Sequence, residues 1–291
     1  MVLFFAARSL ATQWDKVGSR LTHIQFGWQW IGAATALVFV TYALLIEGWR
    51  RVLGAWDSHL PFMQASRIWF LSNLGKYVPG NIWSLTAMGM MARKRGMSAI
   101  AAAGSSVIMQ MVSLATGTAI VMVTSAKLLG QPLLVGAAVV VLAIVLLSAP
   151  KFLPPLAVWV STLIGRDIAP PSVPATSIWT AAVASTLSWL LYGLAFQLFV
   201  RGLLGAAPGE ISSYIAVYTA AYILGFISPI APAGLGVREF TLAAFMTQLG
   251  LANEVDAALI AIAARLWLTV VELIPSGLYI AAGARRKSLP L

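Results

Sequence analysis

Cysteine is absent from this chain of 291 residues, and charged side chains are scarce. Without cysteine the protein has no disulfide, no thiolate metal site and no cysteine nucleophile. Its two histidines, His23 and His59, stand alone in the sequence, so we expect no metal centre. Only 10% of the residues are charged and 60% are hydrophobic, a balance that soluble domains of this size do not show. The composition therefore predicts an integral membrane protein.

Sequence motifs of common enzymes are also missing. There is no Walker-type loop, no glycine-rich dinucleotide fingerprint, no His-Glu-x-x-His and no Gly-x-Ser-x-Gly. We therefore expect no catalytic residues, no enzyme activity and no cofactor. Without a nucleotide-binding loop, any transport would be passive or coupled to an ion gradient.

Acidic residues are few, and the basic excess gives a net charge of +10. The basic residues gather in short clusters at the ends of apolar segments, as at Arg50 and Arg51, Arg93 to Arg95, and Arg285 to Lys287. Such clusters are typical of membrane anchors and topology signals rather than of a nucleic-acid-binding face. We expect no nucleic acid partner.

Long apolar windows predict the fold class. A helix needs about 20 mainly apolar residues to span a bilayer. Five windows qualify: Trp28 to Glu47, Ser98 to Ala126, Pro132 to Ser148, Ser177 to Val200, and Ala257 to Ala282. Membrane β-barrels would instead show alternating segments of about ten residues, and no such alternation persists here. The sequence predicts an all-α, polytopic transmembrane bundle that forms a single domain over residues 1–291.

Two further hydrophobic stretches, residues 61–91 and 210–249, are interrupted midway by proline and glycine. The first breaks between Lys76 and Asn81, and the second between Ser228 and Gly236. Proline lacks a backbone N–H and its ring clashes with the preceding helical turn, so each stretch predicts two half-helices joined by a non-helical turn. At membrane depth such backbone must be shielded by protein or line a wet cavity.

The two breaks occupy matching places in the chain. Gly80 and Gly234 are 154 positions apart, as are Gly96 and Gly250. A constant offset of this kind predicts an internal repeat. Interrupted segments at corresponding positions of two halves are also the best sequence pointer to a transporter-type binding site.

Charge distribution predicts how the halves are oriented. If both broken segments dip into the membrane and return, most basic residues fall on one side; if both cross, they divide almost evenly, which the positive-inside tendency disfavours. We therefore predict re-entrant hairpins, an inverted repeat and a cytoplasmic C-terminus. The first half covers residues 28–149 and the second covers 175–283, with a proline-rich interfacial linker over 150–174.

Ionisable residues inside apolar segments are costly and are functional candidates by default. Lys76 lies at the first break, Arg238 and Glu239 follow the second, and Arg265 and Glu272 lie within the last long helix. Lys76 and Arg238 would attract an anionic headgroup, or else extend to the membrane interface. Glu239 and Glu272 would pair with Arg238 and Arg265, or bind a coupling proton. Arg265 and Glu272 alternatively form a structural ion pair.

The backbone at the breaks supplies the rest of the predicted substrate site. Half-helix N-termini present unpaired amides and a partial positive charge, which favour anions such as phosphate. Glycines let a headgroup approach that backbone closely. We therefore add to the site Pro79, Gly80, Asn81, Gly234 and Gly236.

The motifs Leu74 to Trp83 and Ala233 to Glu239 resemble the lysylphosphatidylglycerol synthase transmembrane-region family of flippase-like proteins, over roughly Gly27 to Gly283. The resemblance implies a membrane region that moves aminoacylated phospholipid between leaflets, with relatives encoded near cell-envelope glycan genes. It also places five residues at the family's characteristic positions: Lys76, Pro79, Gly80, Arg238 and Glu239.

Two departures from the family pattern affect these expectations. The aminoacyl-transferring domain of the synthases does not follow the membrane region before Leu291, so synthesis of the aminoacyl lipid is not expected. Where the family often carries an acidic-basic pair after the first break, this chain has Met109 and Gln110. A charged coupling role is therefore not expected at that position.

The sequence predicts a flippase or scramblase for an anionic phospholipid or a polyprenyl-phosphate-linked lipid, in a bacterial or archaeal cytoplasmic membrane. The expected partners are membrane lipids with anionic headgroups, cell-envelope enzymes and a second copy of the chain. Two alternatives stay open. One is a membrane-embedded glycosyl or lipid transferase, or an accessory subunit of a cell-envelope glycan pathway; the other is a purely structural scaffold.

Overall fold

A computed structural model describes residues 26–56, 58–78, 82–125, 135–144, 174–228 and 232–287, together with residues 133, 148 and 151. Within these ranges the regular elements are all helical, which confirms the all-α prediction. In chain order they are α2 (Trp28–Gly54), α3 (Phe62–Asn73), the 3₁₀ helix η1 (Leu74–Tyr77), α4 (Ile82–Arg93), α5 (Ala99–Thr124), α8 (Ala175–Leu204), α9 (Ile211–Ile227), the 3₁₀ helix η2 (Pro232–Gly234), α10 (Val237–Gln248) and α11 (Glu254–Lys287).

Four helices are long and apolar enough to cross a bilayer, and they confirm four of the five predicted windows. They cover Trp28–Gly54, Ala101–Thr124, Ala175–Leu204 and Glu254–Ala282. In the fifth window the described residues, 133, 135–144 and 148, are all helical, and the other positions of the window lie outside the described residues. Apart from Lys151 and Pro174, the linker predicted over residues 150–174 lies outside the described residues.

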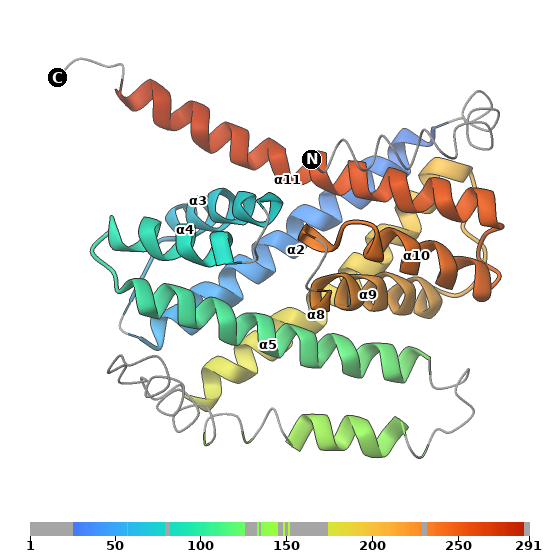
Figure 1. Cartoon of the computed structure of the whole chain (residues 1–291), viewed down its shortest axis with the longest axis horizontal. Coiled ribbons are helices and arrows are strands. Elements are labelled where there is room, and N and C mark those ends of the chain that lie inside the picture. The colour runs from blue at the N-terminus through green and yellow to red at the C-terminus, as the bar shows by residue number, and fades with distance from the viewer. Residues whose placement is uncertain are drawn as a thin grey trace.

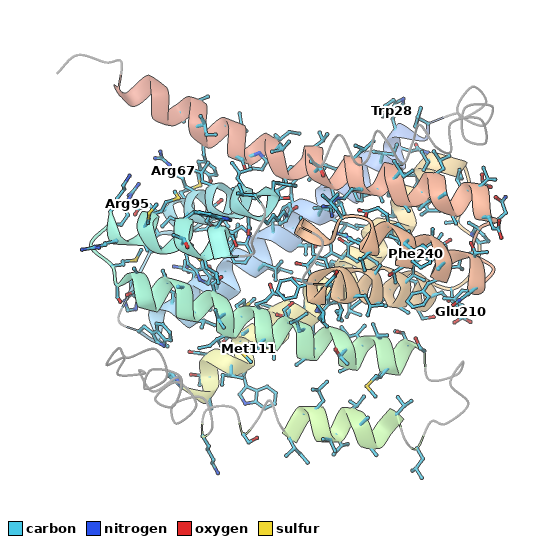
Figure 2. The ribbon with its side chains drawn as sticks, in the orientation of Figure 1. Trp28, Arg67, Arg95, Met111, Glu210 and Phe240 are labelled. Carbon is cyan, nitrogen blue, oxygen red and sulfur yellow. The ribbon has the colours of Figure 1, made fainter. Side chains whose placement is uncertain are left out.

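Large apolar side chains cover the outside of the bundle, as expected of a protein that faces lipid. Trp28 is 72% exposed, Met111 52% and Phe240 76%, and Figure 2 shows all three projecting from their helices. A soluble surface would not expose apolar side chains on this scale. The outer face is therefore suited to hydrocarbon.

Both interrupted stretches fold as predicted into two half-helices around a non-helical turn. The first consists of α3 and η1, then an extended residue at Val78, and then α4. The second consists of α9, η2 and α10. In each stretch the two half-helices pack against one another, α3 on α4 and α9 on α10 (Figure 1).

The two breaks meet in the middle of the molecule, where η1 contacts η2. Glycine at position 234 lets η2 pack closely on α9, because a Cβ there would lie 2.9 Å from the carbonyl oxygen of Gly225 on α9. Gly234 also has a φ of +69°, a conformation that favours glycine. Elements that are distant in sequence are thus brought to one junction.

Contacts between helices follow the same pattern in the two predicted halves. α3 packs on α4 as α9 packs on α10, and α4 packs on α5 as α10 packs on α11. Across the halves, α5 packs on α9 and α11 packs on α3. These contacts are what a repeat that relates α2–α5 to α8–α11 requires. The inverted repeat itself stays a prediction.

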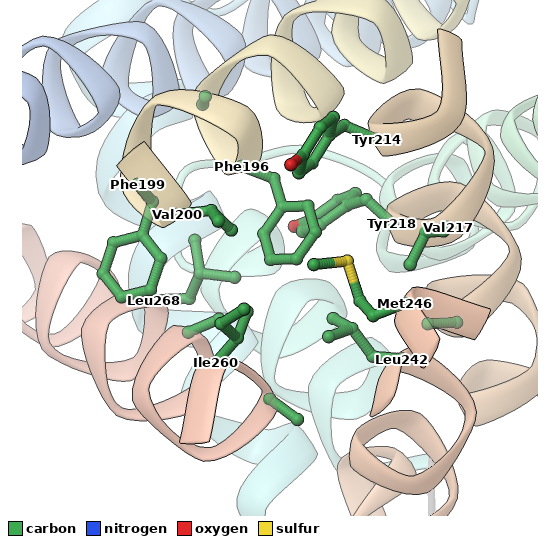
Figure 3. Close-up of a cluster of buried hydrophobic side chains, with 14 of the residues drawn as sticks. Phe196, Phe199, Val200, Tyr214, Val217, Tyr218, Leu242, Met246, Ile260 and Leu268 are labelled. Carbon is green, nitrogen blue, oxygen red and sulfur yellow. The ribbon is translucent and has the colours of Figure 1, made fainter. Parts of the chain in front are cut away.

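A buried apolar cluster fixes the second half around α11. Figure 3 shows Phe196 of α8, Tyr214 of α9, Met246 of α10 and Ile260 of α11 packed together, and all four are fully buried. Close packing is a main source of helix association in lipid, where the hydrophobic effect between helices is weak. The cluster therefore sets the position of α10 and α11, which carry four of the predicted site residues.

Candidate functional site

At the first break, Lys76 and Tyr77 both bind the carboxylate of Glu272. The Lys76 Nζ lies 2.6 Å from each carboxylate oxygen, and the Tyr77 hydroxyl donates to Oε2 at 2.9 Å. The Glu272 side chain is only 6% exposed, whereas that of Lys76 is 40% exposed. Glu272 is thus a buried anion held by one cation and one hydroxyl, with the cation reachable from outside.

The local sequence explains how η1 presents these two side chains. A Cβ at Gly75 would lie 2.6 Å from the backbone nitrogen of Ser84 at the start of α4. Glycine at this position therefore lets η1 rest directly on α4. Lys76 and Tyr77, the next two residues, then reach Glu272 on α11.

At the second break, Arg265 of α11 binds both η2 and α10. Its Nη2 donates to the carbonyl oxygen of Ala233 at 3.0 Å, and its Nε lies 3.5 Å from Oε1 of Glu239. The other Glu239 oxygen accepts the backbone N–H of Gly236 at 2.6 Å. This last bond caps the N-terminus of α10, where the helix dipole also favours a negative charge.

The contact between Arg265 and Glu239 leaves hydrogen-bonding capacity unused. Arg265 Nε and Glu239 Oε1 are buried without a hydrogen-bond partner among the described residues. A cavity of about 10 Å³ adjoins them, with room for about one water molecule. Its lining consists of Arg238, Glu239, Leu242, Ala261, Ala264 and Arg265. This conformation is closed, since a lipid headgroup does not fit there.

Arg238 lies over two aromatic rings instead of pairing with a carboxylate. Its guanidinium carbon is 5.1 Å from the ring centroid of Tyr218 and 5.3 Å from that of Tyr222, both on α9. Within the described ranges, no carboxylate oxygen lies within 4 Å of its nitrogens. Cation–π contacts stabilise the guanidinium, and a guanidinium is a planar donor group suited to binding an anion.

Two of the pairings expected from the sequence are wrong. Glu272 pairs with Lys76 rather than with an arginine, and Arg238 has no carboxylate partner among the described residues. Arg265 and Glu272 do not bind each other; Arg265 contacts η2 and α10, and Glu272 contacts η1. The pairing of Glu239 with Arg265 is as expected.

Most of the predicted substrate site is brought together by α11, which binds the first break through Glu272 and the second through Arg265. Gly234 is buried against α9, and the N–H of Gly236 is taken by Glu239 rather than left for a ligand. Three predicted members lie outside the described residues: Pro79, Gly80 and Asn81.

Sequence reasoning missed several contacts at this junction. The Ala233 carbonyl, the Tyr77 hydroxyl and the two rings below Arg238 were not predicted as members. The rings had a usable signal, since Tyr214, Tyr218 and Tyr222 recur at every fourth position and share one face of α9. The sequence carries no signal for the Ala233 carbonyl, because a backbone acceptor is present at every residue.

A larger cavity lies elsewhere in the molecule, at the C-terminal end of α8. Its volume is about 300 Å³, and its lining consists of Gln197, Leu198, Arg201, Gly205, Ala206 and Ala207. None of the predicted site residues lines it. We place the candidate site at the junction of η1 and η2, because the buried ionised groups lie there and function in membranes concentrates at such groups.

Comparison with known families confirms the resemblance seen in the sequence. The family described as the lysylphosphatidylglycerol synthase TM region matches residues 1–276. The chain belongs to this family. Membership in the lysylphosphatidylglycerol synthase transmembrane-region family makes the chain an integral membrane protein tied to lipid or envelope biology. A comparison with curated proteins finds no matching sequence.

Proposed function

We propose that this chain is a flippase or scramblase that moves an anionic phospholipid or a polyprenyl-phosphate-linked lipid between leaflets. The headgroup binds at the junction of η1 and η2. The observation that carries the proposal is that the two broken segments meet there, with Lys76 at one break and Arg238 at the other. Family membership supports the lipid class of the substrate.

The charges at the junction favour an anion. Lys76, Arg238 and Arg265 supply three positive charges, and Glu239 and Glu272 supply two negative ones, so the group carries a net charge of +1 when all five are ionised. This excess of positive charge attracts a negatively charged headgroup. Arg238 supplies a planar fork suited to phosphate oxygens.

Opening of the junction is part of the proposed mechanism. The present cavity beside Arg238 holds about one water molecule, so the half-helices have to separate before a headgroup binds. Non-helical backbone at Val78, Ser228 and Ala233, beside the half-helices, is suitable as a hinge because it lacks the hydrogen bonds of a continuous helix. In this proposal the pairs α3–α4 and α9–α10 are re-entrant hairpins of an inverted repeat, placed in a cytoplasmic membrane.

The proposal assigns no bond-making step to the protein. The described polar groups at the junction hold one another in ion pairs and hydrogen bonds, and the carboxylate that accepts the Tyr77 hydroxyl is already paired with the Lys76 ammonium. We therefore propose transport rather than catalysis.

Reconstitution of the full chain into liposomes tests this function. Vesicles carrying a trace of acyl-labelled phosphatidylglycerol are treated with a membrane-impermeant quencher, which reports exchange between leaflets. We expect protein-dependent exchange that falls in Lys76→Ala and Arg238→Ala. Exposed residues of the same types provide matched controls, and Lys94→Ala and Arg95→Ala should exchange lipid at the wild-type rate.

A folded sample that moves neither phosphatidylglycerol nor a polyprenyl phosphate between leaflets would contradict the proposal. Formation of a new lipid or glycan product without movement between leaflets would instead indicate a transferase or an accessory subunit. Normal binding and exchange in both junction variants would indicate a structural role for Lys76 and Arg238.

A further inference from the structure

We propose that Glu272 is a proton-binding residue that takes up one proton when an anionic headgroup binds at Lys76. The inference rests on the proposed function, because it concerns the same junction. When the headgroup phosphate takes Lys76, Glu272 loses its cation and takes one proton from water. When the headgroup leaves, the proton leaves and the ion pair forms again.

The two carboxylates at the junction differ in what holds them. Glu239 accepts a backbone N–H from Gly236 at the start of α10, so its charge is stabilised by the helix that carries it. Glu272 lies within α11, and among the described residues its side chain is bound only by Lys76 and Tyr77. Both of these partners belong to η1, so a movement of η1 removes them together.

Among the described residues, no second cation is in contact with the Glu272 carboxylate. The ionisable groups nearby on other helices are tyrosines: Tyr42 of α2, Tyr192 of α8, and Tyr218 and Tyr222 of α9. Arg238 of α10 lies over its two tyrosine rings, and Arg265 is bound to the Ala233 carbonyl and lies beside Glu239. From α3, the backbone of Phe70 binds Ser276, while Arg67 projects near the edge of the molecule (Figure 2).

Accessibility decides which partner of the ion pair meets the headgroup. Lys76 is 40% exposed and Glu272 is 6% exposed. A phosphate approaching from the break therefore reaches the ammonium and competes with the carboxylate for it. A carboxylate left buried without a cation is strongly unfavourable, and binding a proton removes its charge.

Binding of the headgroup together with the proton balances in charge. Before it, the Lys76 ammonium is paired with the Glu272 carboxylate; after it, the ammonium is paired with the phosphate and Glu272 is a neutral acid. One negative charge and one proton are added together, so the net charge at the junction is unchanged. Headgroup binding and proton binding then strengthen each other by the same factor.

Proton uptake on binding provides a direct test. The full chain in detergent and weak buffer near neutral pH is mixed with water-soluble dihexanoyl phosphatidylglycerol, and a pH dye reports protons removed from solution. The phosphodiester does not itself titrate there. We expect about one proton taken up for each lipid bound. Glu272→Gln should bind the lipid without uptake. Glu254→Gln, which changes an exposed glutamate of the same helix, should still take up a proton, and dihexanoyl phosphatidylcholine, which has no net charge, is the control lipid.

Binding of the anionic lipid without proton uptake by the wild type would overturn the inference, as would equal uptake by Glu272→Gln. Absence of saturable binding would also overturn it. These results are distinguishable from failure of the proposed function. A protein that exchanges lipid between leaflets but takes up no proton keeps the function and loses the coupling. A protein that takes up the proton but moves no lipid keeps the coupling and loses the proposed transport function.

Discussion

Lys76 and Glu272 are 196 positions apart in the chain, yet the Lys76 ammonium lies 2.6 Å from both carboxylate oxygens of Glu272. The pair ties the first break to the last long helix. It therefore connects the two predicted halves of the molecule, and in our proposal an anionic headgroup opens this contact.

Loss of one member of this pair should destabilise the protein more than loss of both. Lys76→Met leaves a buried carboxylate without its cation, and we expect the free energy of unfolding to fall by about 1–3 kcal/mol, because Lys76 is partly exposed. Adding Glu272→Leu should recover most of this loss. Thermal unfolding in detergent measures the stability of the single and the double variant. Arg51→Ala, which removes the surface ion pair with Glu47, is the control and should change the stability little. Equal stability of the single and double variants would contradict the prediction.

Close approach at the second break makes Gly234 sensitive to a single methyl group. Alanine there adds the strain of a positive φ, about 1–2 kcal/mol, and also a contact 2.9 Å from the Gly225 carbonyl oxygen. Gly250 is the matched control, since its φ is +65° but nothing lies within 4 Å of a built Cβ. Unfolding measurements should rank Gly234→Ala as clearly less stable than Gly250→Ala. A reversed or equal ranking would mean that the contact with α9 is relaxed in solution.

The breaks could be predicted from sequence because proline and glycine act on backbone within a few residues. The end of η1 at Tyr77 and the start of α10 at Val237 fall where the local rules require. The four confirmed spans were predictable for a related reason, since length and hydrophobicity decide whether a segment can cross a bilayer.

The partners of the charged side chains could not be predicted in the same way. With so few acids in apolar segments, Glu239 and Glu272 were identifiable as the counter-ions. Which cation each one binds depends on how α11 packs against both breaks, and no local rule encodes that packing. Arg238 was expected from the sequence to pair with a carboxylate. Its aromatic partners were missed because they lie on α9, a different half-helix from the one that carries Arg238.

The planar guanidinium of Arg238 should matter beyond its charge. Arg238→Lys keeps a cation but removes the fork that binds two phosphate oxygens, and it weakens the contact with the Tyr218 and Tyr222 rings. We expect affinity for a phosphatidylglycerol probe to fall by roughly tenfold, the effect of losing one charge-assisted hydrogen bond. In binding titrations the affinity should change little in Arg95→Lys, which makes the same substitution at an exposed arginine. Unchanged affinity in Arg238→Lys would place the headgroup elsewhere.

Acidification should strengthen binding of an anionic headgroup, and the sign follows from the competition at Lys76. The ionised Glu272 carboxylate holds the Lys76 ammonium and opposes the phosphate; a proton on Glu272 frees the ammonium for it. If one proton is bound with each lipid, the dissociation constant should fall by up to about tenfold for each unit of decrease in pH. Glu272→Gln mimics the neutral acid, so it should bind tightly at neutral pH and respond little to acid, whereas Glu254→Gln, at an exposed position of the same helix, should keep the wild-type slope. Titrations of the three proteins with a non-titrating phosphodiester lipid across this range measure the slopes. A flat wild-type profile, or an equal slope in Glu272→Gln, would assign the proton to another group or to none.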